Sequence, residues 1–374
     1  MRTLILTCNT GGGHNTCAAA IAQAYHRQGL VCDTADALQF TSLRLSRFLS
    51  WGHTTMYRRI PGLFQRGYRF AEQHPSVMSD GSPLPRLLSA GSRRLYEYIR
   101  QGQYDAVLCV HVFSAVLLQQ TLQDFPLTLR TGFVATDYTC SPGAAGDLDY
   151  YFIPHRSLCG EFIAGGTAPE RLVISGIPID RRFTADTQRP AAQPRRLVMM
   201  CGSMGCGPME ELTAFFLRHL PQEAALTVVC GSNEKLRRRL SELVQGHENI
   251  RICGFVTDMA ELLDSADLCL TKPGGLSTTE TAAMGVPMVL IDAVAGCETH
   301  NMRFFLDCGG AVTADEPRAL GELCLSLLDD PARRAEMTRQ LRAVSKPDAA
   351  MTVCAVMTAG YQKREASHGC MGRV

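Results

Sequence analysis

Two glycine-rich loops, each placed between an expected strand and an expected helix, carry residues that could do chemistry. The first covers residues 9–14 (NTGGGH) and lies between an apolar run at 1–8 and an Ala-rich helix expected over 16–28. The second covers residues 202–207 (GSMGCG), between an apolar run at 197–201 and a helix expected over 210–219. Glycine lets backbone N–H groups crowd around an anion, and a helix N-terminus adds about half a positive charge. We therefore expect both loops to border an anionic ligand.

The densest polar motif lies at residues 272–280 (KPGGLSTTE), directly after a strand expected over 268–271. Its glycines open a helix on which the hydroxyls of Ser277 or Thr278, with backbone N–H groups, could bind a diphosphate. Glu280 suits a ribose diol, because a carboxylate accepts two O–H hydrogen bonds. Taken alone, the string also fits an ordinary helix cap with a dipole-favoured acid.

The elements that position these motifs alternate between strands and helices. Strands are expected at 1–8, 30–36, 106–111, 129–135, 150–154 and 172–175, and then at 197–201, 225–230, 250–253, 268–271 and 288–291. Such alternation predicts parallel sheets with helices on both faces, whose ligands lie at the carboxyl ends of the strands. The fold class is therefore α/β, with two Rossmann-like, doubly wound domains facing a cleft.

The domain boundaries follow from changes in composition along the chain. We expect an N-terminal, acceptor-side domain at 1–183, a Pro-, Ala- and Gln-rich linker at 184–195 and a C-terminal domain at 196–345. A helix at 346–364 is expected to return to the N-terminal domain, and a disordered tail is expected at 365–374.

Composition excludes several classes of protein. The net charge of +1, from 37 basic and 36 acidic residues, gives no case for a nucleic-acid partner. The sixteen cysteines form no CxxC pair and mostly lie in apolar runs, so we expect a reducing compartment without disulfides or zinc. No apolar run approaches the length of a membrane span, and residues 1–8 are too short for a signal-peptide core.

The motifs of the second half together resemble the C-terminal domain of family 28 glycosyltransferases, which have the two-domain GT-B fold. The spacing Pro-Gly-Gly, Glu, Gly-Val-Pro over residues 273–287 and the segment 295–301 (AGCETHN) carry this resemblance. It implies a UDP-sugar donor whose ribose is bound by Glu280. The other donor-binding residues implied are Gly202, Ser203, Met204 and Gly205 near the phosphates, Phe255 and Val256 near the uracil, and Gly274, Gly275, Ser277, Thr278, Gly296, Glu298 and Asn301.

The first half closely resembles the monogalactosyldiacylglycerol synthases and the related bacterial diacylglycerol glucosyltransferases. Residues 9–15 and residues 135–138 (ATDY) carry the likeness, and Gly12, Gly13, Asn15 and Tyr138 fall in the implied acceptor and phosphate loops. The resemblance implies transfer of a hexose, from UDP-glucose or UDP-galactose, to the hydroxyl of diacylglycerol with inversion at the sugar. No metal or other cofactor is expected. The plant enzymes have His-Pro and Trp where this chain has 139–143 (TCSPG), so the loop expected to line the acceptor side departs from the plant pattern.

A lipid hydroxyl needs a base to remove its proton, and two residues could serve. His14 is the best candidate, because the unperturbed pKa of histidine lies near working pH. Asp137 could orient the imidazole and stabilise its charged form, or could itself be the base. The structural alternatives are a histidine beside a helix cap and a turn-capping aspartate. For Pro154-His155, we expect a structural turn rather than a polar lining of the acceptor side.

A stretch between Asp36 and Glu72 could contact a membrane, because it holds six arginines, several aromatic residues and no acidic residue. The membrane-facing candidates are Arg47, Trp51, Arg58, Arg59 and Phe64. Basic and aromatic residues on an amphipathic segment suit an anionic lipid surface. The alternative is a helix packed on the sheet with a solvated basic face. We expect a cytoplasmic protein, peripherally bound at the inner face of the cell membrane.

Three other functions stay open on these residues. The same fold could act on another amphiphilic acceptor, such as a polyprenyl-linked or peptidoglycan-precursor-like alcohol. A UDP-sugar epimerase shares two facing domains and a UDP site, but it would need further catalytic carboxylates. A non-catalytic binding module is disfavoured by the presence of both His14 and Asp137.

Overall fold

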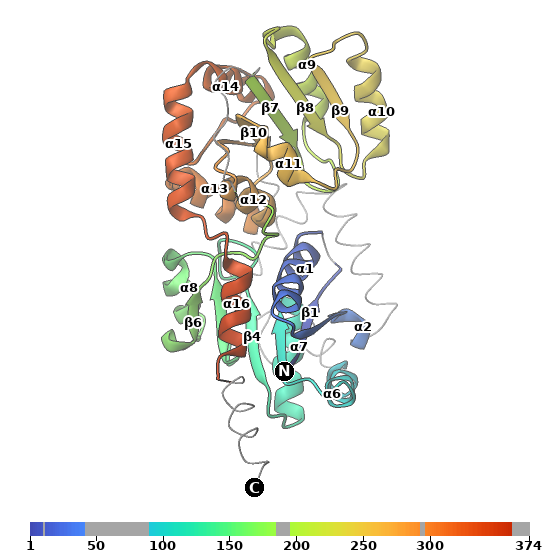
Figure 1. Ribbon diagram of the computed structural model, residues 1–374, viewed down its shortest axis with the longest axis vertical. Helices are drawn as coiled ribbons and strands as arrows, with labels where there is room; N and C mark the ends of the chain where they lie inside the picture. The colour runs from blue at the N-terminus through green and yellow to red at the C-terminus, as the bar shows by residue number, and fades with distance from the viewer. Residues whose placement is uncertain (10–11, 42–89, 185–194, 292–295, 361–374) are drawn as a thin grey trace. The chain divides into compact units, whose positions relative to one another are not determined.

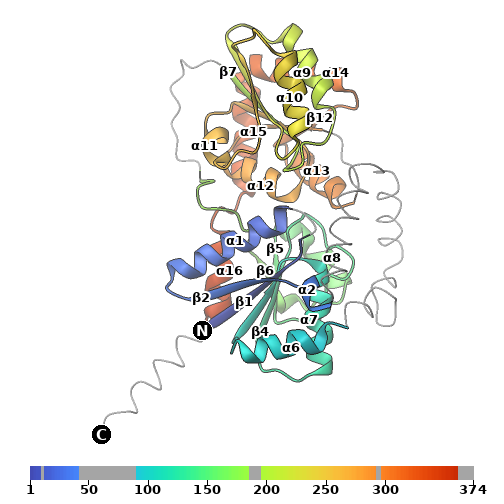
Figure 2. The same ribbon diagram turned by 90° about the vertical axis from the view of Figure 1, so that its right-hand side faces the viewer.

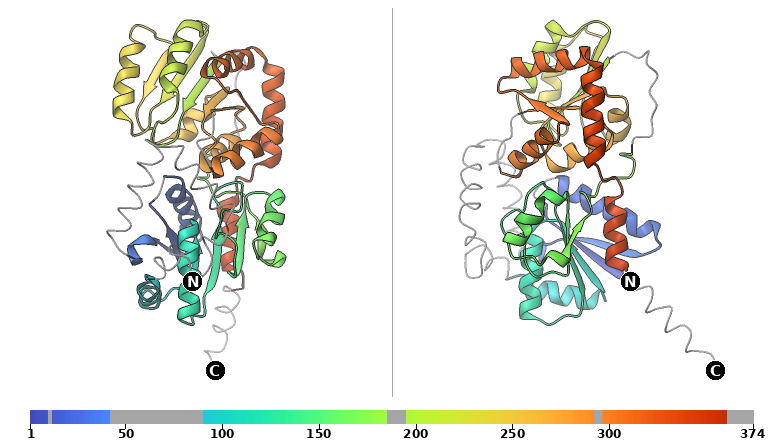
Figure 3. Two further views of the ribbon diagram at one scale, coloured as in Figure 1. Left: turned by 180° about the vertical axis from the view of Figure 1, so that it is seen from behind. Right: turned by 90° about the vertical axis from the view of Figure 1, so that its left-hand side faces the viewer.

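The computed structural model describes residues 1–9, 12–41, 90–184, 195–291 and 296–360, and they fall into two compact units. Unit 1 combines Met1–Arg181 with Lys346–Val374, and unit 2 is Arg182–Ser345. Most of the expected linker at 184–195 and all of the expected tail at 365–374 lie outside the described residues. Each unit is a parallel sheet with helices on both faces (Figure 1, Figure 3).

Unit 1 is built on a sheet with the strand order β2-β1-β3-β4-β5-β6, in which all described pairs are parallel. Helices α1 and α16 cover one face of this sheet, and α6 and α7 cover the other (Figure 2). The strands are β1 (Arg2–Thr7), β2 (Val31–Asp36), β3 (Ala106–Cys109), β4 (Arg130–Val134), β5 (Tyr150–Ile153) and β6 (Leu172–Ile174). The helices are α1 (Gly12–Arg27), α2 (Leu38–Thr41), α6 (Ser92–Gln101), α7 (Val112–Asp124), α8 (Cys159–Ala164) and α16 (Ala349–Thr358), with short 3-10 turns η2 (Arg156–Leu158) and η3 (Pro169–Arg171).

Unit 2 has a second parallel sheet, with the strand order β12-β11-β10-β7-β8-β9. The strands are β7 (Arg195–Met200), β8 (Ala224–Val229), β9 (Ile250–Cys253), β10 (Leu268–Thr271), β11 (Met288–Leu290) and β12 (Ala311–Thr313). The helices are α9 (Met209–His219), α10 (Glu234–Leu243), α11 (Met259–Asp264), α12 (Gly275–Ala283), α13 (Cys297–Asp307), α14 (Pro317–Asp329) and α15 (Pro331–Val344). The predicted α/β class with two doubly wound sheets is therefore confirmed.

The inner strands are apolar because helices cover both of their faces. In β1 every residue from Thr3 to Thr7 is buried, and all four residues of β3 are buried. Helix α1 buries Cys17, Ile21, Ala24 and Tyr25, which follow one another at helical spacing, against this sheet. The cores of the two units are thus separate layers, each formed between one sheet and its own helices.

The strand order reverses once in each sheet, and each glycine-rich loop lies at a reversal. In unit 1 the chain leaves β1 toward β2 but leaves β3 toward β4, so the reversal lies between β1 and β3. In unit 2 the corresponding point lies between β7 and β10. Ligands of open α/β sheets bind beyond the carboxyl ends of the strands at such points. The topology therefore predicts that ligands bind near the segments that follow β1, β3, β7 and β10.

Three local features differ from the expectations or extend them. Helix α1 begins at Gly12 rather than residue 16, so Gly12, Gly13 and His14 form its first turn. Strand β12 was not predicted, because its three residues are too few to show a periodic pattern. The C-terminal helix α16 packs beside α1 and β4, and Arg130 donates to the carbonyls of Met357 (2.9 Å) and Ala359 (2.6 Å) at its end. None of the described helices is long and apolar enough to cross a bilayer.

Candidate active site

His14 lies in the first turn of α1 and is held there by the end of a neighbouring strand. Its Nδ1 is 2.9 Å from the carbonyl oxygen of Val110, the residue that follows β3. A carbonyl oxygen can only accept, so Nδ1 carries the proton of the neutral ring. Nε2 then holds a lone pair. A neutral histidine in this tautomer can take a proton from a hydroxyl through Nε2.

Thr136 links His14 to Asp137 at the end of β4. The Thr136 Oγ1 lies 3.1 Å from His14 Nδ1 and donates its proton to Asp137 Oδ2 at 3.3 Å. Asp137 therefore polarises a hydroxyl whose lone pairs face the imidazole. This arrangement stabilises the ring when it becomes positively charged. The role of Thr136 was not predicted, because nothing in a single sequence distinguishes this residue from an ordinary strand-end threonine.

The surroundings of His14 keep it neutral at physiological pH. Burial lowers the pKa of His14 below 6.5, and the nearby Asp137 carboxylate and the Val110 carbonyl offset part of that shift. The ring of His111 packs against it edge to face, with ring centroids 4.5 Å apart and planes at 74°. His111, which begins the turn after β3, was also missed by the sequence reasoning.

The other acceptor-side candidates have structural partners. Asn15 accepts from the Thr7 hydroxyl at 2.8 Å and donates to Asn9 Oδ1 at 2.9 Å, so its amide closes the loop after β1. Gly12 is exposed and Gly13 is partly exposed in the same turn of α1, whereas the Tyr138 side chain is buried. These contacts give Asn15 a structural role that the sequence did not predict.

The segments that follow β4 and β5 are shaped by two polar side chains. Glu161 of α8 accepts from the Cys140 amide at 2.8 Å and from the Thr139 hydroxyl at 3.2 Å. Burial, together with Glu161, raises the pKa of Cys140 to about 12. His155 caps η2, with its Nδ1 accepting from the Ser157 amide at 3.2 Å, which is the structural turn that we expected.

In unit 2, the glycine loop after β7 is pinned by the loop after β8. Gly205 has a φ of +55°, and a Cβ there would lie 2.2 Å from the carbonyl oxygen of Cys230. Ser232 donates to the Ser203 carbonyl from both its amide (2.8 Å) and its hydroxyl (3.0 Å). The Asn233 side chain donates to the Gly205 carbonyl at 3.0 Å. Ser232 and Asn233 were not predicted, because they come from a different part of the sequence. Gly202, Ser203 and Met204 have some exposure, as a ligand-binding turn requires.

Helix α12 presents Ser277 and Glu280 on one partly exposed face, three residues apart. Gly274 is its N-cap, and the amides of Gly275 and Ser277 lie in the first turn, where N–H groups have no partner within a helix. Thr278 is 0% exposed, and its hydroxyl donates to the Gly274 carbonyl at 2.9 Å. Of the two hydroxyls expected to bind a diphosphate, that of Ser277 therefore belongs to the partly exposed residue.

The segment that begins α13 contacts the turn before α12. Asn301 is 0% exposed, and its amide donates to the Pro273 carbonyl at 3.0 Å, so it helps to position that turn. Gly296 precedes α13 with a φ of +66°, a conformation that favours glycine. Glu298 follows in the first turn of α13 and is partly exposed.

A buried cation, Lys272, lies beside the glycine loop. Strand pairing places Thr271 next to Met200, which brings Lys272 alongside Cys201 at the carboxyl edge of the sheet. The positive charge of Lys272 lowers the pKa of Cys201 and Glu298 raises it, although burial dominates and the pKa is about 12. Three segments distant in sequence therefore meet at one place: the loop after β7, the turn after β10 and the start of α13.

Phe255 is the most exposed large apolar side chain in the described part of unit 2, at 68%. It follows β9 together with Val256, which is partly exposed. An aromatic face held in water is suited to stack on a planar base.

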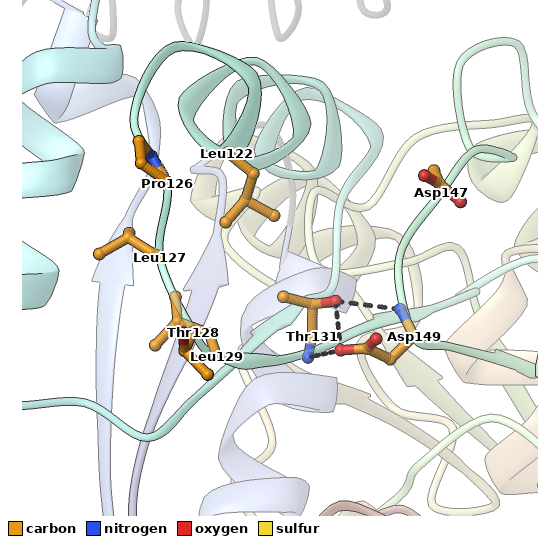
Figure 4. A pocket seen from close by; sticks show the side chains of 8 residues that line it. All are labelled: Leu122, Pro126, Leu127, Thr128, Leu129, Thr131, Asp147 and Asp149. Carbon is orange, nitrogen blue, oxygen red and sulfur yellow. Dashed lines mark hydrogen bonds between the residues drawn. The ribbon is translucent and has the colours of Figure 1, made fainter.

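One pocket among the described residues is lined by residues other than the site candidates. A pocket of about 430 Å³ lies near the amino ends of β4 and β5, where Asp149 accepts from the Thr131 amide at 2.7 Å (Figure 4). None of its lining residues is a candidate site residue.

No three His, Cys, Asp or Glu side chains in the described ranges gather as a metal site would require. Arg47, Trp51, Arg58, Arg59 and Phe64 lie outside the described residues.

Comparison with known families gives one match for each unit. Residues 14–179 match the family model described as monogalactosyldiacylglycerol (MGDG) synthase, and residues 195–330 match the one described as glycosyl transferases group 1. A curated relative from Bacillus pumilus (strain SAFR-032), named processive diacylglycerol beta-glucosyltransferase, is 26% identical over 363 residues. That alignment covers 94% of this chain and 93% of the relative.

Solved structures with the same fold include both transferases and epimerases. MurG from Acinetobacter baumannii matches with a TM-score of 0.64 at 17% identity, covering 96% of this chain and 99% of that one. A putative UDP-N-acetylglucosamine 2-epimerase from Listeria monocytogenes matches with a TM-score of 0.65 at 14% identity, covering 96% and 97%. These likenesses show the fold, which by itself does not choose between transfer and epimerisation. The family models and the similarity to the curated relative favour transfer: the first unit carries a monogalactosyldiacylglycerol synthase domain and the second a glycosyl transferases group 1 domain, so the chain is a glycosyltransferase of the GT-B fold.

Proposed function

We propose that this glycosyltransferase moves a hexose from a UDP-sugar to the hydroxyl of diacylglycerol and so makes a membrane glycolipid. The observation that carries the proposal is the His14 arrangement, in which Nδ1 is committed to the Val110 carbonyl and Nε2 can accept a proton. The names of the curated relatives favour glucose as the sugar. Galactose is the alternative suggested by the name of the family model that matches unit 1.

The proposed reaction is a single displacement. The acceptor oxygen forms a bond to the anomeric carbon while the bond from that carbon to the UDP oxygen breaks, and UDP leaves with the electron pair. The hydroxyl proton passes to His14 Nε2, and the resulting imidazolium is stabilised by Asp137 through Thr136. One displacement from the opposite face inverts the anomeric configuration.

We assign the donor to unit 2, where the groups suit each part of a nucleotide sugar. Lys272 and the N-terminus of α12 offer positive potential to the diphosphate, and the negative charge on the departing UDP develops there. Glu280 can accept from the ribose hydroxyls, and Phe255 can stack on the uracil.

A radiolabelled donor panel tests the proposal. UDP-glucose and UDP-galactose are each incubated with diacylglycerol vesicles, and the lipid extract is scored for labelled product. We expect transfer from UDP-glucose. His14→Ala should lower the rate by about a hundredfold or more, while the Kd of UDP from calorimetry changes by less than about twofold, since His14 lies in unit 1.

His155→Ala is the matched control, because this histidine caps a turn without touching His14 in the described contacts. Labelled product from neither donor would refute the proposed function. A parallel loss of UDP affinity and transfer in His14→Ala would refute the base assignment but leave the reaction standing.

We also propose that the chain binds the inner face of the cell membrane peripherally. The support is the sequence between Asp36 and Glu72 alone, where arginines mix with aromatic residues. Replacing Arg58 and Arg59 with Ser should reduce sedimentation with anionic vesicles, because each charge contributes about 1 kcal/mol near such a surface. Arg318→Ser with Arg339→Ser gives the same charge change on α14 and α15 as a control. Equal sedimentation of the two double variants would contradict this proposal.

A further inference from the structure

His111 occupies the turn between β3 and α7, where it has two separate sets of contacts. Its Nδ1 accepts from the Phe113 amide at 3.0 Å, which makes it the N-cap of α7. Its ring contacts two other rings, with centroid distances of 4.5 Å to His14 and 4.8 Å to Phe113. The side chain is half-buried, so both contacts restrict its orientation.

The cap bond determines the tautomer of His111. Because the Nδ1 lone pair accepts the Phe113 amide, the proton of the neutral ring is on Nε2. A second proton on Nδ1 would break the cap and place a positive charge at the N-terminus of α7, where the helix dipole opposes it. His111 and His14 are therefore neighbouring rings with opposite tautomers, and only His14 has Nε2 open to a proton.

The same turn supplies two contacts to His14 from consecutive residues. Val110 gives the carbonyl that accepts from Nδ1, and His111 gives the ring that packs against the imidazole. Val110 is itself anchored to β1 through its amide, which donates to the Leu6 carbonyl at 3.0 Å. His14 thus has one polar and one aromatic restraint from the end of β3, in addition to Thr136 and Asp137 from the end of β4.

We propose that His111 is a positioning residue for the transfer reaction, whose ring holds the His14 imidazole in the orientation that presents Nε2 to the acceptor hydroxyl. The inference rests on the proposed function for its catalytic consequence. Its structural content does not depend on the substrate: the His111 ring fixes the orientation in which His14 Nδ1 donates to the Val110 carbonyl.

Two substitutions separate the ring of His111 from its cap. His111→Asn keeps the cap, because asparagine is among the best N-cap residues, but removes the ring that packs on His14. His111→Phe keeps a ring and loses the cap. We expect His111→Asn to melt near the wild-type temperature and to lose about tenfold in kcat, with the KM for UDP-glucose within about twofold of wild type. We expect His111→Phe to melt at a lower temperature and to keep kcat within about threefold.

His155→Asn is the matched control, since His155 caps η2 in the same way, with its Nδ1 accepting from the Ser157 amide. It undergoes the same chemical change at the same kind of turn. We expect its kcat to equal that of the wild-type protein.

A second readout does not require turnover. In protein labelled with ¹⁵N-histidine, long-range proton–nitrogen correlations distinguish protonated from unprotonated ring nitrogens, and His14→Gln identifies the His14 signals among the ten histidines. We expect wild-type His14 to be protonated at Nδ1, and His111→Asn to shift its signals toward a mixture of the two tautomers. His155→Asn should leave them unchanged.

The outcomes separate the two proposals. A wild-type protein that transfers no hexose refutes the proposed function, and the tautomer measurement still tests His111. Unchanged His14 signals in His111→Asn, or a kcat within twofold of wild type, would overturn the positioning role. Should His111→Phe fail to fold, His111→Asn against His155→Asn decides the question alone.

Discussion

Replacing Asp137 by Asn is the sharpest test of how His14 works. Asn has the same size as Asp and keeps an oxygen that can accept from the Thr136 hydroxyl, so the variant removes the negative charge with little change in shape. The contacts of 3.1 Å and 3.3 Å through Thr136 place the carboxylate within about 6 Å of His14 Nδ1. The substitution therefore measures the electrostatic support that one charge gives to the imidazolium.

Coulomb's law sets the size of the expected effect. Two unit charges about 6 Å apart interact by about 0.7 kcal/mol in water and about 2.8 kcal/mol at an effective dielectric constant near 20. Both side chains are partly exposed, so an intermediate value of about 1.4 kcal/mol is expected, which equals one pKa unit or a tenfold change in rate. Asp137 raises the pKa of His14 and burial lowers it. Removal of the Asp137 charge should therefore lower the pKa of His14 further.

The assay is the pH dependence of transfer from UDP-glucose to diacylglycerol. His14 must be neutral to act as the base, so activity falls as the pH drops through its pKa, which lies below 6.5 in the wild-type protein. In Asp137→Asn this acid limb should move about one unit lower, and the plateau rate should fall about tenfold. If activity instead disappeared in Asp137→Asn and persisted in His14→Ala, Asp137 would be the base and the role given to His14 would be refuted.

Three further predictions concern the donor site and the fold. Glu280→Ala should weaken UDP binding in calorimetry about tenfold or more, because each hydrogen bond to a carboxylate contributes about 1.5–3 kcal/mol; an unaltered Kd would show that the ribose lies elsewhere. Gly205→Ala should also weaken UDP binding, since its Cβ would lie 2.2 Å from a carbonyl oxygen, whereas Gly160→Ala meets nothing within 4 Å and should be neutral. Arg130→Met removes the donor to the end of α16 and should lower the free energy of unfolding by about 2 kcal/mol; an unchanged urea midpoint would mean that apolar packing alone holds this helix.

Much of the fold was accessible from the sequence because both sheets are parallel and buried. Strands such as β1 and β3 are apolar on both faces, so they stand out as short continuous runs before glycine or helix signals. The start of α1 was placed four residues late, since glycines inside a first helical turn look like a loop in the sequence. Strand β12 gave no signal, because three residues do not reveal a period of two.

The site was predicted only at the level of motifs. His14, Asp137, Ser277 and Glu280 could be named because their chemistry is visible one residue at a time. The roles of Thr278 and Asn301 were not visible, since the first turns its hydroxyl into its own helix and the second is buried beneath Pro273. Whether a polar side chain reaches a ligand or serves the backbone depends on its burial, and burial is a property of the packed unit.

By itself, the sequence determined the alternation of strands and helices, the two glycine-rich loops and the side chains able to act as base or anion ligand, because each of these depends on neighbours a few residues away. Only the tertiary structure decided which of those side chains meet. His14, Val110, His111 and Thr136 come from three segments separated by up to 122 residues, and they touch because β1, β3 and β4 lie side by side in one sheet. The tautomer of His14, on which the proposed chemistry depends, follows from a carbonyl oxygen 96 residues away.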